Sequence, residues 1–327
     1  MSFFINLLRR KISEDDLVDL HGKVAIITGG NSGIGFTTIQ FLARKGARVY
    51  MACRREEAYK EASKRLEEAG LGDGSVHWLH LDLSDPRLAS KAAKEFLQKE
   101  DRLDILINNA ARGSQGTFSK TKDGIQEAMV TNYLSHFVLA ETLLPLMIQT
   151  SKQEGSDVRI LEVTSTAHSG VSPASFKGKE NWNVDYGTGI FAGLKFYALS
   201  KLANVIHMKH LQERLDAQNA DIICIAVDPG AIATENVARW IDSMSYFPAL
   251  ITWILVSLVF VSPREGAMNS AYAAASPEVK ARGDAFKGAH LTPVGRITTP
   301  SRYAQDDRLA KELYETSMEI VEELNLL

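Results

Sequence analysis

From residue 23 onward, short apolar runs alternate with longer stretches in which apolar residues recur at helical spacing. The apolar runs are rich in β-branched residues and read, in order, VAIIT, RVYMA, VHWLHLD, LDILINN, VRILEVTS and IICIAV. The stretches between them predict helices at 34–45, 56–69, 87–99, 125–148 and 196–217. Strands that are apolar on both faces and alternate with helices indicate a parallel sheet with helices on each side. The pattern therefore predicts a doubly wound α/β fold.

The alternation continues without a break. It contains no proline- or glycine-rich linker, internal repeat or low-complexity tract. We therefore expect one domain over residues 20–327, preceded by an extension over residues 1–19.

Two apolar segments lie outside this rhythm. The start, MSFFINLLRRK, lacks the features of a secretory signal, and it is either a short interfacial anchor or a locally packed terminus. Residues 249–261 form an apolar run of 13 residues, whose helical length of roughly 20 Å is too short to span a bilayer. This run is either a buried or lid helix over an apolar pocket, or a segment that enters one leaflet. We expect a cytoplasmic protein, either free or peripheral on a membrane surface.

The charge and the cysteine content limit the partners and the compartment that we expect for this protein. The 37 Lys and Arg residues against 40 Asp and Glu residues give a net charge of −3, so we expect no nucleic-acid partner. Cys53 and Cys224 both lie in apolar strand-like runs, which favours buried thiols in a reducing compartment. His207 and His210 in HMKH are expected on a helix surface, and we predict no metal site.

A glycine-rich turn joins the first predicted strand to the first predicted helix. In VAIITGGNSGIG, Gly29, Gly33 and Gly35 allow positive φ angles and a close approach of the backbone. The helix that follows offers free N–H groups and the positive end of its dipole to a pyrophosphate. This turn therefore predicts a dinucleotide site.

Several motifs together resemble one family. TGGNSGIG, NNAA, VTNYLSHF, VTSTAH, YALSK and DPGAIATE occur in the order seen in short-chain dehydrogenase/reductases, which have a Rossmann fold. Further stretches, including ACRR, SKLANV and SPREGAMNSAYAAASPEV, are similar to the branch with retinol dehydrogenases, carbonyl reductases and the WW-domain oxidoreductase. The resemblance extends from about residue 20 to residue 323.

The resemblance implies which residues bind a nicotinamide dinucleotide. Asp82 is expected at the adenine, Asn109 and Ala110 along the cofactor, and the Pro229, Gly230 and Thr234 group at the nicotinamide amide. The complete expected set is Gly29, Asn31, Ser32, Gly33, Ile34, Gly35, Arg54, Asp82, Leu83, Asn109, Ala110, Tyr197, Lys201, Pro229, Gly230 and Thr234.

The end of the second strand bears on the choice of cofactor. An acidic residue at this point would bind the adenosine ribose hydroxyls and repel the additional phosphate of NADP. This chain has Cys53 there and Arg54 after it, which favours NADP(H). Alternatively, Arg54 is a solvated charge at the start of the next helix, as we expect for Arg55.

Tyr197 and Lys201 lie four residues apart and therefore share one helix face, where they either pack or react. A nearby ammonium favours the phenolate of a tyrosine. The resemblance implies that Tyr197 exchanges a proton with the substrate oxygen while hydride passes to or from nicotinamide, and that Lys201 also binds ribose. It further implies that Ser165 hydrogen-bonds the substrate oxygen and that Asn132 holds water in a proton relay to Lys201.

Two features depart from the family pattern. Ala111 stands where a glycine is usual, and we expect only a local backbone difference. Ser165 precedes Tyr197 by 32 positions, a longer gap than the family's commonest one. The additional chain is expected to loop out and shape the pocket mouth.

The segment around 232–262 occupies the family's substrate-lid position and is strongly apolar. Such a lining favours a lipophilic ketone, aldehyde or alcohol, although these side chains alternatively belong to a core or face a membrane. A catalytically silent NADP(H)-binding scaffold or redox sensor is the alternative function. The two long helices often pair across a homodimer in this family, so a homodimer is a further expectation.

Overall fold

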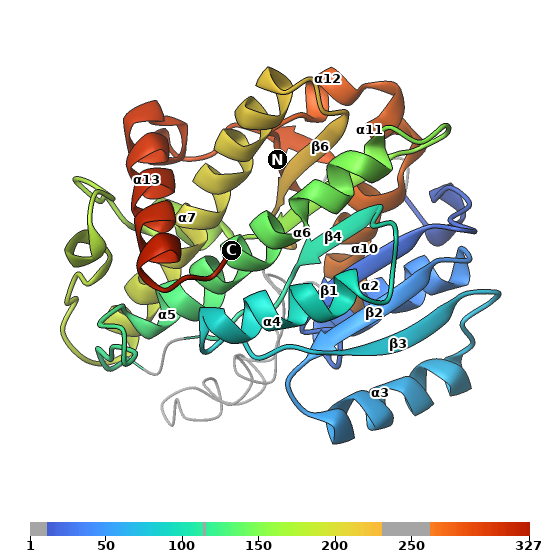
Figure 1. Cartoon of the computed structure of the whole chain (residues 1–327), viewed down its shortest axis with the longest axis horizontal. Helices are drawn as coiled ribbons and strands as arrows, with labels where there is room; N and C mark the ends of the chain where they lie inside the picture. Colours follow the sequence, from blue (N-terminus) through green and yellow to red (C-terminus); the bar gives the residue numbers. More distant parts are fainter. Residues whose placement is uncertain (1–11, 114–115, 231–261) are drawn as a thin grey trace, which may run out of the picture.

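A computed structural model describes residues 12–113, 116–230 and 262–327 (Figure 1). Its centre is an eight-stranded sheet in the order β3-β2-β1-β4-β5-β6-β7-β8, in which only β8 runs antiparallel to its neighbour. The strands are β1 (Val24–Thr28), β2 (Arg48–Cys53), β3 (Ser75–His80), β4 (Ile105–Asn108), β5 (Val158–Val163), β6 (Ile222–Val227), β7 (His290–Thr292) and β8 (Arg296–Thr298). The predicted doubly wound fold is confirmed.

Helices cover both faces of the sheet (Figure 1). The longer ones are α2 (Gly33–Arg44), α3 (Glu56–Ala69), α4 (Pro86–Leu97), α6 (Ser135–Ser151), α7 (Ile190–Ala217), α10 (Pro263–Ala275) and α13 (Asp307–Glu323). The short ones are η2 (Glu14–Asp16), α5 (Glu127–Met129), the π-helix η3 (Val130–Leu134), η4 (Thr166–Gly170), η5 (Lys179–Trp182), α11 (Pro277–Ala281), α12 (Gly283–Phe286) and η6 (Arg302–Gln305).

The strands read as continuous apolar runs because both of their faces are buried. In β1, Ile26 contributes to a core under α4, α6, α7 and α13, whereas Ala25 and Ile27 contribute to a second core under α2, α3 and α10. Side chains of a strand alternate between faces, so a strand between two helical layers needs apolar residues at every position.

The additional chain between Ser165 and Tyr197 is anchored on α13. Phe176 and Trp182 are completely buried in the core. Glu312 of α13 accepts hydrogen bonds from the Ser175 hydroxyl and the Phe176 N–H group at 2.7 and 2.9 Å. The middle of this segment therefore packs on the C-terminal helix, in addition to looping out as expected.

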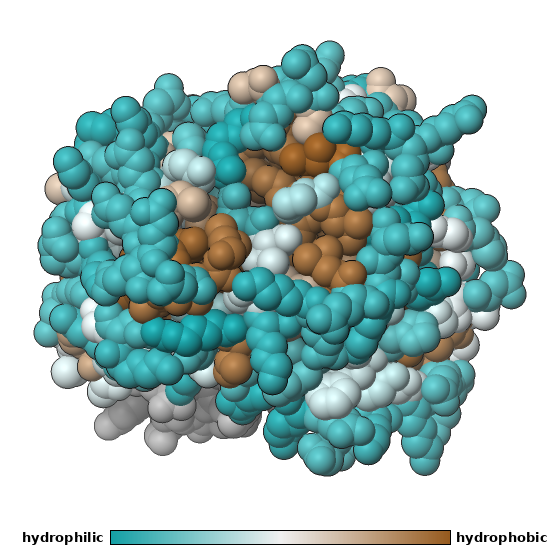
Figure 2. All heavy atoms as spheres, viewed as in Figure 1, coloured by the Kyte–Doolittle hydropathy of each residue, from teal (hydrophilic) through white to brown (hydrophobic). Residues whose placement is uncertain are grey.

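The C-terminal helix packs on α7, one of the two helices that were expected to pair in a homodimer, and reaches only the start of the other (Figure 1). The Tyr133 hydroxyl at the start of the α6 region hydrogen-bonds Ser317 of α13 at 2.7 Å, and Lys209 of α7 pairs with Asp307 at 2.5 Å. In the same view, apolar side chains gather near the middle of this face inside a polar rim (Figure 2). The homodimer stays a prediction.

Some expectations concern residues that the structure does not describe. The apolar start, the run 249–261 and Thr234 lie outside the described residues. Among the helices that are described, none has the length and apolar character needed to cross a membrane. Both cysteines are buried free thiols, as expected.

The expectation of a helix-surface position is wrong for His207. Its ring is buried between α7 and the sheet and contacts the rings of Tyr133 and Phe137, with centroids 5.8 and 5.3 Å away. His210 is partly exposed and contacts Tyr314 of α13. The two rings differ because a step of three residues turns about 60° around the helix, which takes His210 from the buried side toward α13.

Candidate active site

The glycine turn leaves an open cradle at the start of α2. Gly29 has a φ angle of +66°, and a Cβ atom there would lie 3.0 Å from Ala110. A Cβ atom on Gly35 would lie 2.6 Å from the Gly29 carbonyl oxygen, so both glycines are needed for packing. Gly33 differs, because its φ is +56° but a Cβ atom would have no atom within 4 Å.

Gly33 is the first residue of α2, so the free space beside it lies at the start of this helix. Ser32 precedes this turn and makes no capping hydrogen bond, so its side chain does not occupy the N–H groups that a helix start leaves free. Asn31 and Ile34 are partly exposed beside it. The residues therefore fit a bound pyrophosphate, which needs positive φ, close backbone approach and free N–H donors.

A threonine holds the carboxyl ends of β1 and β4 together. The Thr28 hydroxyl accepts hydrogen bonds from the N–H groups of Asn109 and Ala110, both at 2.9 Å. The Asn109 side chain donates to the Thr28 carbonyl at 2.8 Å. Asn109 and Ala110 thus lie beside the turn, as the cofactor prediction requires, while Ala111 is exposed.

The ends of β2 and β3 bring three further expected cofactor residues, Arg54, Asp82 and Leu83, to the same edge of the sheet. Arg54 is exposed and forms no ion pair within the described part of the chain, whereas Arg55 takes the position just before α3. Asp82 accepts a hydrogen bond from the Ser84 N–H group at 2.9 Å, and the Leu83 carbonyl accepts one from Ser135 at 2.9 Å. Parallel strands end together at this edge, where ligands bind in such sheets.

Tyr197, Ser165 and Lys201 meet at the ends of β5 and α7. The Tyr197 hydroxyl hydrogen-bonds the side chain of Ser165, which follows β5 and precedes η4. The Lys201 ammonium donates to the Val163 carbonyl at 2.6 Å and lies 5.6 Å from the centre of the Tyr197 ring. The structure thus brings together three of the four expected catalytic side chains.

Burial decides the charges of this group. It raises the pKa of Tyr197 to about 12, although the Ser165 hydrogen bond acts in the opposite direction. Burial also lowers the pKa of Lys201 to about 8, against the fields of Glu162 and Asp228. In the protein alone, this effect of burial on the Tyr197 pKa outweighs the expected influence of the ammonium, which favours the phenolate. At neutral pH the pair is a phenol beside an ammonium, which is the state of a proton donor.

Asn132 lies in the π-helical turn η3, a feature that is frequent at functional sites. Its side-chain amide donates to the Ser200 hydroxyl at 3.0 Å and to the Arg112 carbonyl at 3.1 Å. Its side-chain oxygen accepts from the Arg112 N–H group at 2.8 Å. Asn132 thus joins α7 to the segment after β4, and its place in a proton relay stays a prediction.

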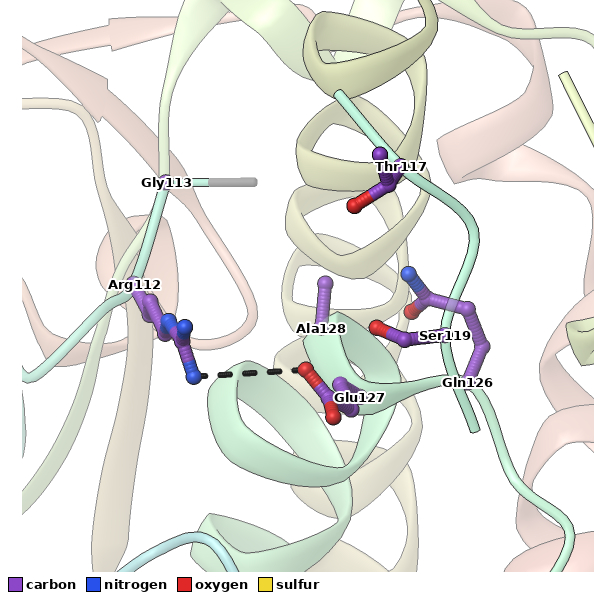
Figure 3. A pocket seen from close by; sticks show the side chains of 7 residues that line it. All are labelled: Arg112, Gly113, Thr117, Ser119, Gln126, Glu127 and Ala128. Atoms are coloured by element: carbon purple, nitrogen blue, oxygen red, sulfur yellow. Dashed lines mark ion pairs between the residues drawn. The ribbon is translucent and has the colours of Figure 1, made fainter. Parts of the chain in front are cut away.

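A small polar pocket lies beside this segment (Figure 3). Its volume is about 100 Å³, and it is lined by Arg112, Gly113, Thr117, Ser119, Gln126, Glu127 and Ala128. Arg112 and Glu127 form an ion pair across it at 3.9 Å. This pocket is smaller than the roughly 300–1,000 Å³ typical of ligand sites, and its lining does not include Ser165, Tyr197 or Lys201.

The end of β6 adds a residue that sequence reasoning missed. Asp228 is buried, and its side chain accepts a hydrogen bond from the N–H group of Gly230 at 2.8 Å. Burial raises the pKa of Asp228, and its charge acts on both Tyr197 and Lys201. Pro229 and Gly230 follow it at the same edge of the sheet as the glycine turn. The feature of the sequence that could have identified Asp228 was its position directly after an apolar strand.

The sheet and the glycine turn define this protein as an α/β protein with a Rossmann fold. A family model for short chain dehydrogenases matches residues 23–175. A short-chain dehydrogenase/reductase of Armillaria gallica is 40% identical over 304 residues, which cover 93% of this chain and 94% of the relative. Retinol dehydrogenase 11 of Mus musculus is 30% identical over 309 residues, with 93% and 88% covered.

Solved structures agree on the fold. An uncharacterised protein of Mycobacterium paratuberculosis superimposes with a TM-score of 0.69 at 26% identity, covering 96% of this chain and 98% of that one. L-sorbose reductase of Gluconobacter frateurii, complexed with NADPH and L-sorbose, gives 0.65 at 20% identity, with 85% and 98% covered. The chain belongs to the short-chain dehydrogenase/reductase family, and its class of activity is that of an oxidoreductase.

Proposed function

We propose that the protein is an NADP(H)-dependent oxidoreductase that interconverts a lipophilic ketone or aldehyde and the corresponding alcohol. The observation that carries the proposal is the convergence of the Tyr197 phenol, the Ser165 hydroxyl and the Lys201 ammonium at the edge of the sheet where the glycine turn lies. A protein with only a structural use for these residues has no need for a buried ammonium beside a partly buried phenol.

The nicotinamide ring, when bound, supplies or accepts the hydride. In reduction, the Tyr197 hydroxyl would donate its proton to the carbonyl oxygen, which would become the hydroxyl of the alcohol. Ser165 donates a hydrogen bond to the same oxygen, and the Lys201 ammonium stabilises the phenolate that remains. Oxidation uses the same groups in reverse, with the phenolate as the base.

The preference for NADP(H) is proposed from Arg54. This side chain is exposed after β2 and forms no ion pair in the part of the chain that the structure describes. A guanidinium there suits the phosphate that distinguishes NADP from NAD. The L-sorbose reductase structure, which shares the fold, contains NADPH.

A lipophilic substrate is proposed from the first turns of α7. Ile190, Phe191 and Leu194 are large apolar side chains exposed by 46%, 80% and 55%. Ile190, Leu194, Tyr197 and Lys201 follow one another at spacings of four, three and four residues. Ile190 and Leu194 therefore continue the face of the helix that carries the reacting pair. An exposed apolar surface beside a reacting group is a feature of ligand sites.

The test is NADPH consumption by the purified protein with retinal, medium-chain aldehydes, aromatic ketones and steroid ketones. We expect turnover that favours NADPH over NADH and falls about 10²- to 10⁴-fold in Tyr197→Phe, because the proton donor is lost. The matched control is Tyr186→Phe, another partly buried tyrosine, whose turnover is expected within twofold of wild type. Undiminished turnover in Tyr197→Phe would overturn the proposal, and cofactor binding without turnover on any substrate would support the scaffold or sensor alternative.

A further inference from the structure

Helix α7 has a polar face that extends from the candidate active site into the core. Tyr197, Lys201, Asn204 and His207 follow one another at spacings of four, three and three residues, which places them along one side of the helix. Lys201, Asn204 and His207 are all buried. A helix face that packs against a parallel sheet is normally apolar, so this row of polar side chains needs an explanation.

Two polar residues of the sheet face this row of side chains. Asn108 and Glu162 are register partners on β4 and β5, and both are completely buried. The Asn108 amide donates to one Glu162 carboxylate oxygen at 2.8 Å, and the His207 ring nitrogen Nδ1 lies 3.7 Å from the same oxygen. Asn108, Glu162, Asn204 and His207 together are named the inner polar cluster.

The inner polar cluster is poorly satisfied. Six of its side-chain atoms have no hydrogen-bond partner among the described residues, namely Asn108 Oδ1, Glu162 Oε2, both amide atoms of Asn204 and both ring nitrogens of His207. Each such buried atom costs about 1–3 kcal/mol of stability. A cluster that only stabilised the fold would not carry this cost.

Glu162 is linked to Lys201 by the chain itself. The carbonyl that accepts the Lys201 hydrogen bond belongs to Val163, the residue after Glu162. Lys201 is only 1% exposed, and the described residues place no carboxylate within ion-pair distance of its ammonium. A buried ammonium needs a nearby negative charge to remain protonated.

Several titratable groups face this region. Glu162 faces it from β5, Asp228 from the end of β6, His136 from α6, and Tyr197 and His207 from α7 itself. Burial lowers the pKa of His136, which is therefore uncharged at neutral pH. The negative charges that act on Lys201 are thus those of Glu162 and Asp228, and the first has the larger effect.

We propose that Glu162 is a positioning residue for the reacting pair: its buried carboxylate, held by Asn108 and flanked by His207, keeps Lys201 as an ammonium beside Tyr197. This inference rests on the proposed function. The inner polar cluster then has a use that offsets its cost, because an ammonium at Lys201 stabilises the phenolate that Tyr197 becomes when it gives up its proton.

The variant Glu162→Gln removes the charge and keeps the size and the hydrogen-bonding capacity of the side chain. Without the carboxylate, Lys201 loses its proton at a lower pH. We therefore expect the alkaline limb of kcat for NADPH-linked reduction to move about one pH unit lower. On that limb kcat falls about tenfold, whereas at pH 6 kcat stays within twofold of wild type and the substrate KM is little changed.

Two variants separate this role from a structural one. Glu162→Asp keeps the charge and is expected to keep the wild-type pH profile. Asp104→Asn removes another completely buried carboxylate, at the opposite end of β4, and is expected to leave the pH profile unshifted. A uniform loss of kcat at every pH in Glu162→Gln would overturn the inference.

Folding of the test variant is checked by NADPH binding and thermal unfolding. If Glu162→Gln does not fold, Asn108→Ala provides the test, because it removes the donor that holds the carboxylate and is expected to shift the limb in the same direction by a smaller amount. An unshifted alkaline limb of kcat in Asn108→Ala would also overturn the inference. Wild-type protein without turnover would defeat the proposed function itself, whereas wild-type turnover with an unshifted Glu162→Gln profile would defeat only this inference.

Discussion

Buried charged and polar groups differ in their hydrogen-bond partners at the two ends of the central strands. At the amino end, Asp104 accepts hydrogen bonds from Arg102 at 2.7 and 2.9 Å and from the Val24 N–H group at 3.0 Å. Arg159 at the start of β5 is completely buried and donates to Asp157 and to the carbonyls of Ala273 and Ser276. These charges have partners on every side, which is how a structural ion pair is tolerated in a core.

At the carboxyl end of the same strands, buried polar atoms lack such partners. Glu162 Oε2, Asn108 Oδ1 and Asp228 Oδ2 have none among the described residues. Two exposed arginines of β2 differ in a similar way: Arg48 at the amino end pairs with Glu100 at 2.9 Å, whereas Arg54 after the carboxyl end has no ion pair in the described structure. The difference separates an amino edge whose buried charges are paired from a carboxyl edge at which we propose that binding and proton transfer take place.

The largest expected effect is that of Lys201→Met at the carboxyl end. We expect reductase activity to fall about 10³-fold, because the cation beside Tyr197 is lost. Stability should rise, because burial lowers the pKa of Lys201 from 10.5 to about 8, so folding at pH 7 keeps an unfavourable buried charge. Allowing for the lost hydrogen bond to Val163, the gain is about 2 kcal/mol.

Urea unfolding at several pH values measures this gain. Between pH 8 and 10.5 the wild-type protein regains stability relative to the variant, because only its unfolded state still binds the proton. The gain is therefore complete at pH 7 and disappears above pH 10.5. Lys209→Met on the partly exposed side of α7 is the control, and a loss of stability in Lys201→Met would contradict the comparison.

Asp104→Asn tests the amino end. We expect it to lower the free energy of unfolding by about 3 kcal/mol, because the Arg102 charge loses its buried partner, while kcat stays within twofold of wild type. Glu162→Gln, at the other end, is expected to cost less than about 1 kcal/mol, since its carboxylate has fewer partners to lose. Chemical denaturation of the two variants gives the comparison directly, and a reversed order of stabilities would break it.

Arg54→Ser tests the unpaired arginine of β2. We expect the KM for NADPH to rise about 10- to 100-fold while the KM for NADH changes little, because a charge-assisted hydrogen bond to the additional phosphate is lost. Arg55→Ser is the matched control one residue further along the chain. Equal changes for both cofactors, or in both variants, would argue against a phosphate-binding role.

Phe191→Ser tests the apolar surface that precedes Tyr197. We expect the KM for a long-chain aldehyde to rise about fivefold to thirtyfold, since a side chain of this size contributes about 1–2 kcal/mol when it is covered by a substrate. A short aldehyde should show no change, and thermal unfolding should be unaffected because the side chain is 80% exposed. A parallel rise for both aldehydes would remove the support for a lipophilic substrate.

Much of the fold was predictable because its signals are local. The run 24–28 and the helix 56–69 match β1 and α3 at both ends, since an apolar run bounded by turn residues and a periodic stretch bounded by a glycine are complete within the sequence. By contrast, β7 and β8 were not predicted, because three-residue strands at a sheet edge carry no apolar period. The helix at 196–217 in fact starts at Ile190, ahead of the apolar pattern.

The sequence by itself determined the doubly wound sheet, the glycine turn and the order of Ser165, Tyr197 and Lys201, because periodicity, positive φ and spacing along one helix are properties of neighbouring residues. The tertiary structure alone decided the charges at the site. Burial sets the pKa of Tyr197 and Lys201, and the charges of Glu162 and Asp228 act on Lys201 only because two parallel strands end beside α7. Desolvation and charge pairing depend on residues that are distant in the chain, so no local pattern encodes them.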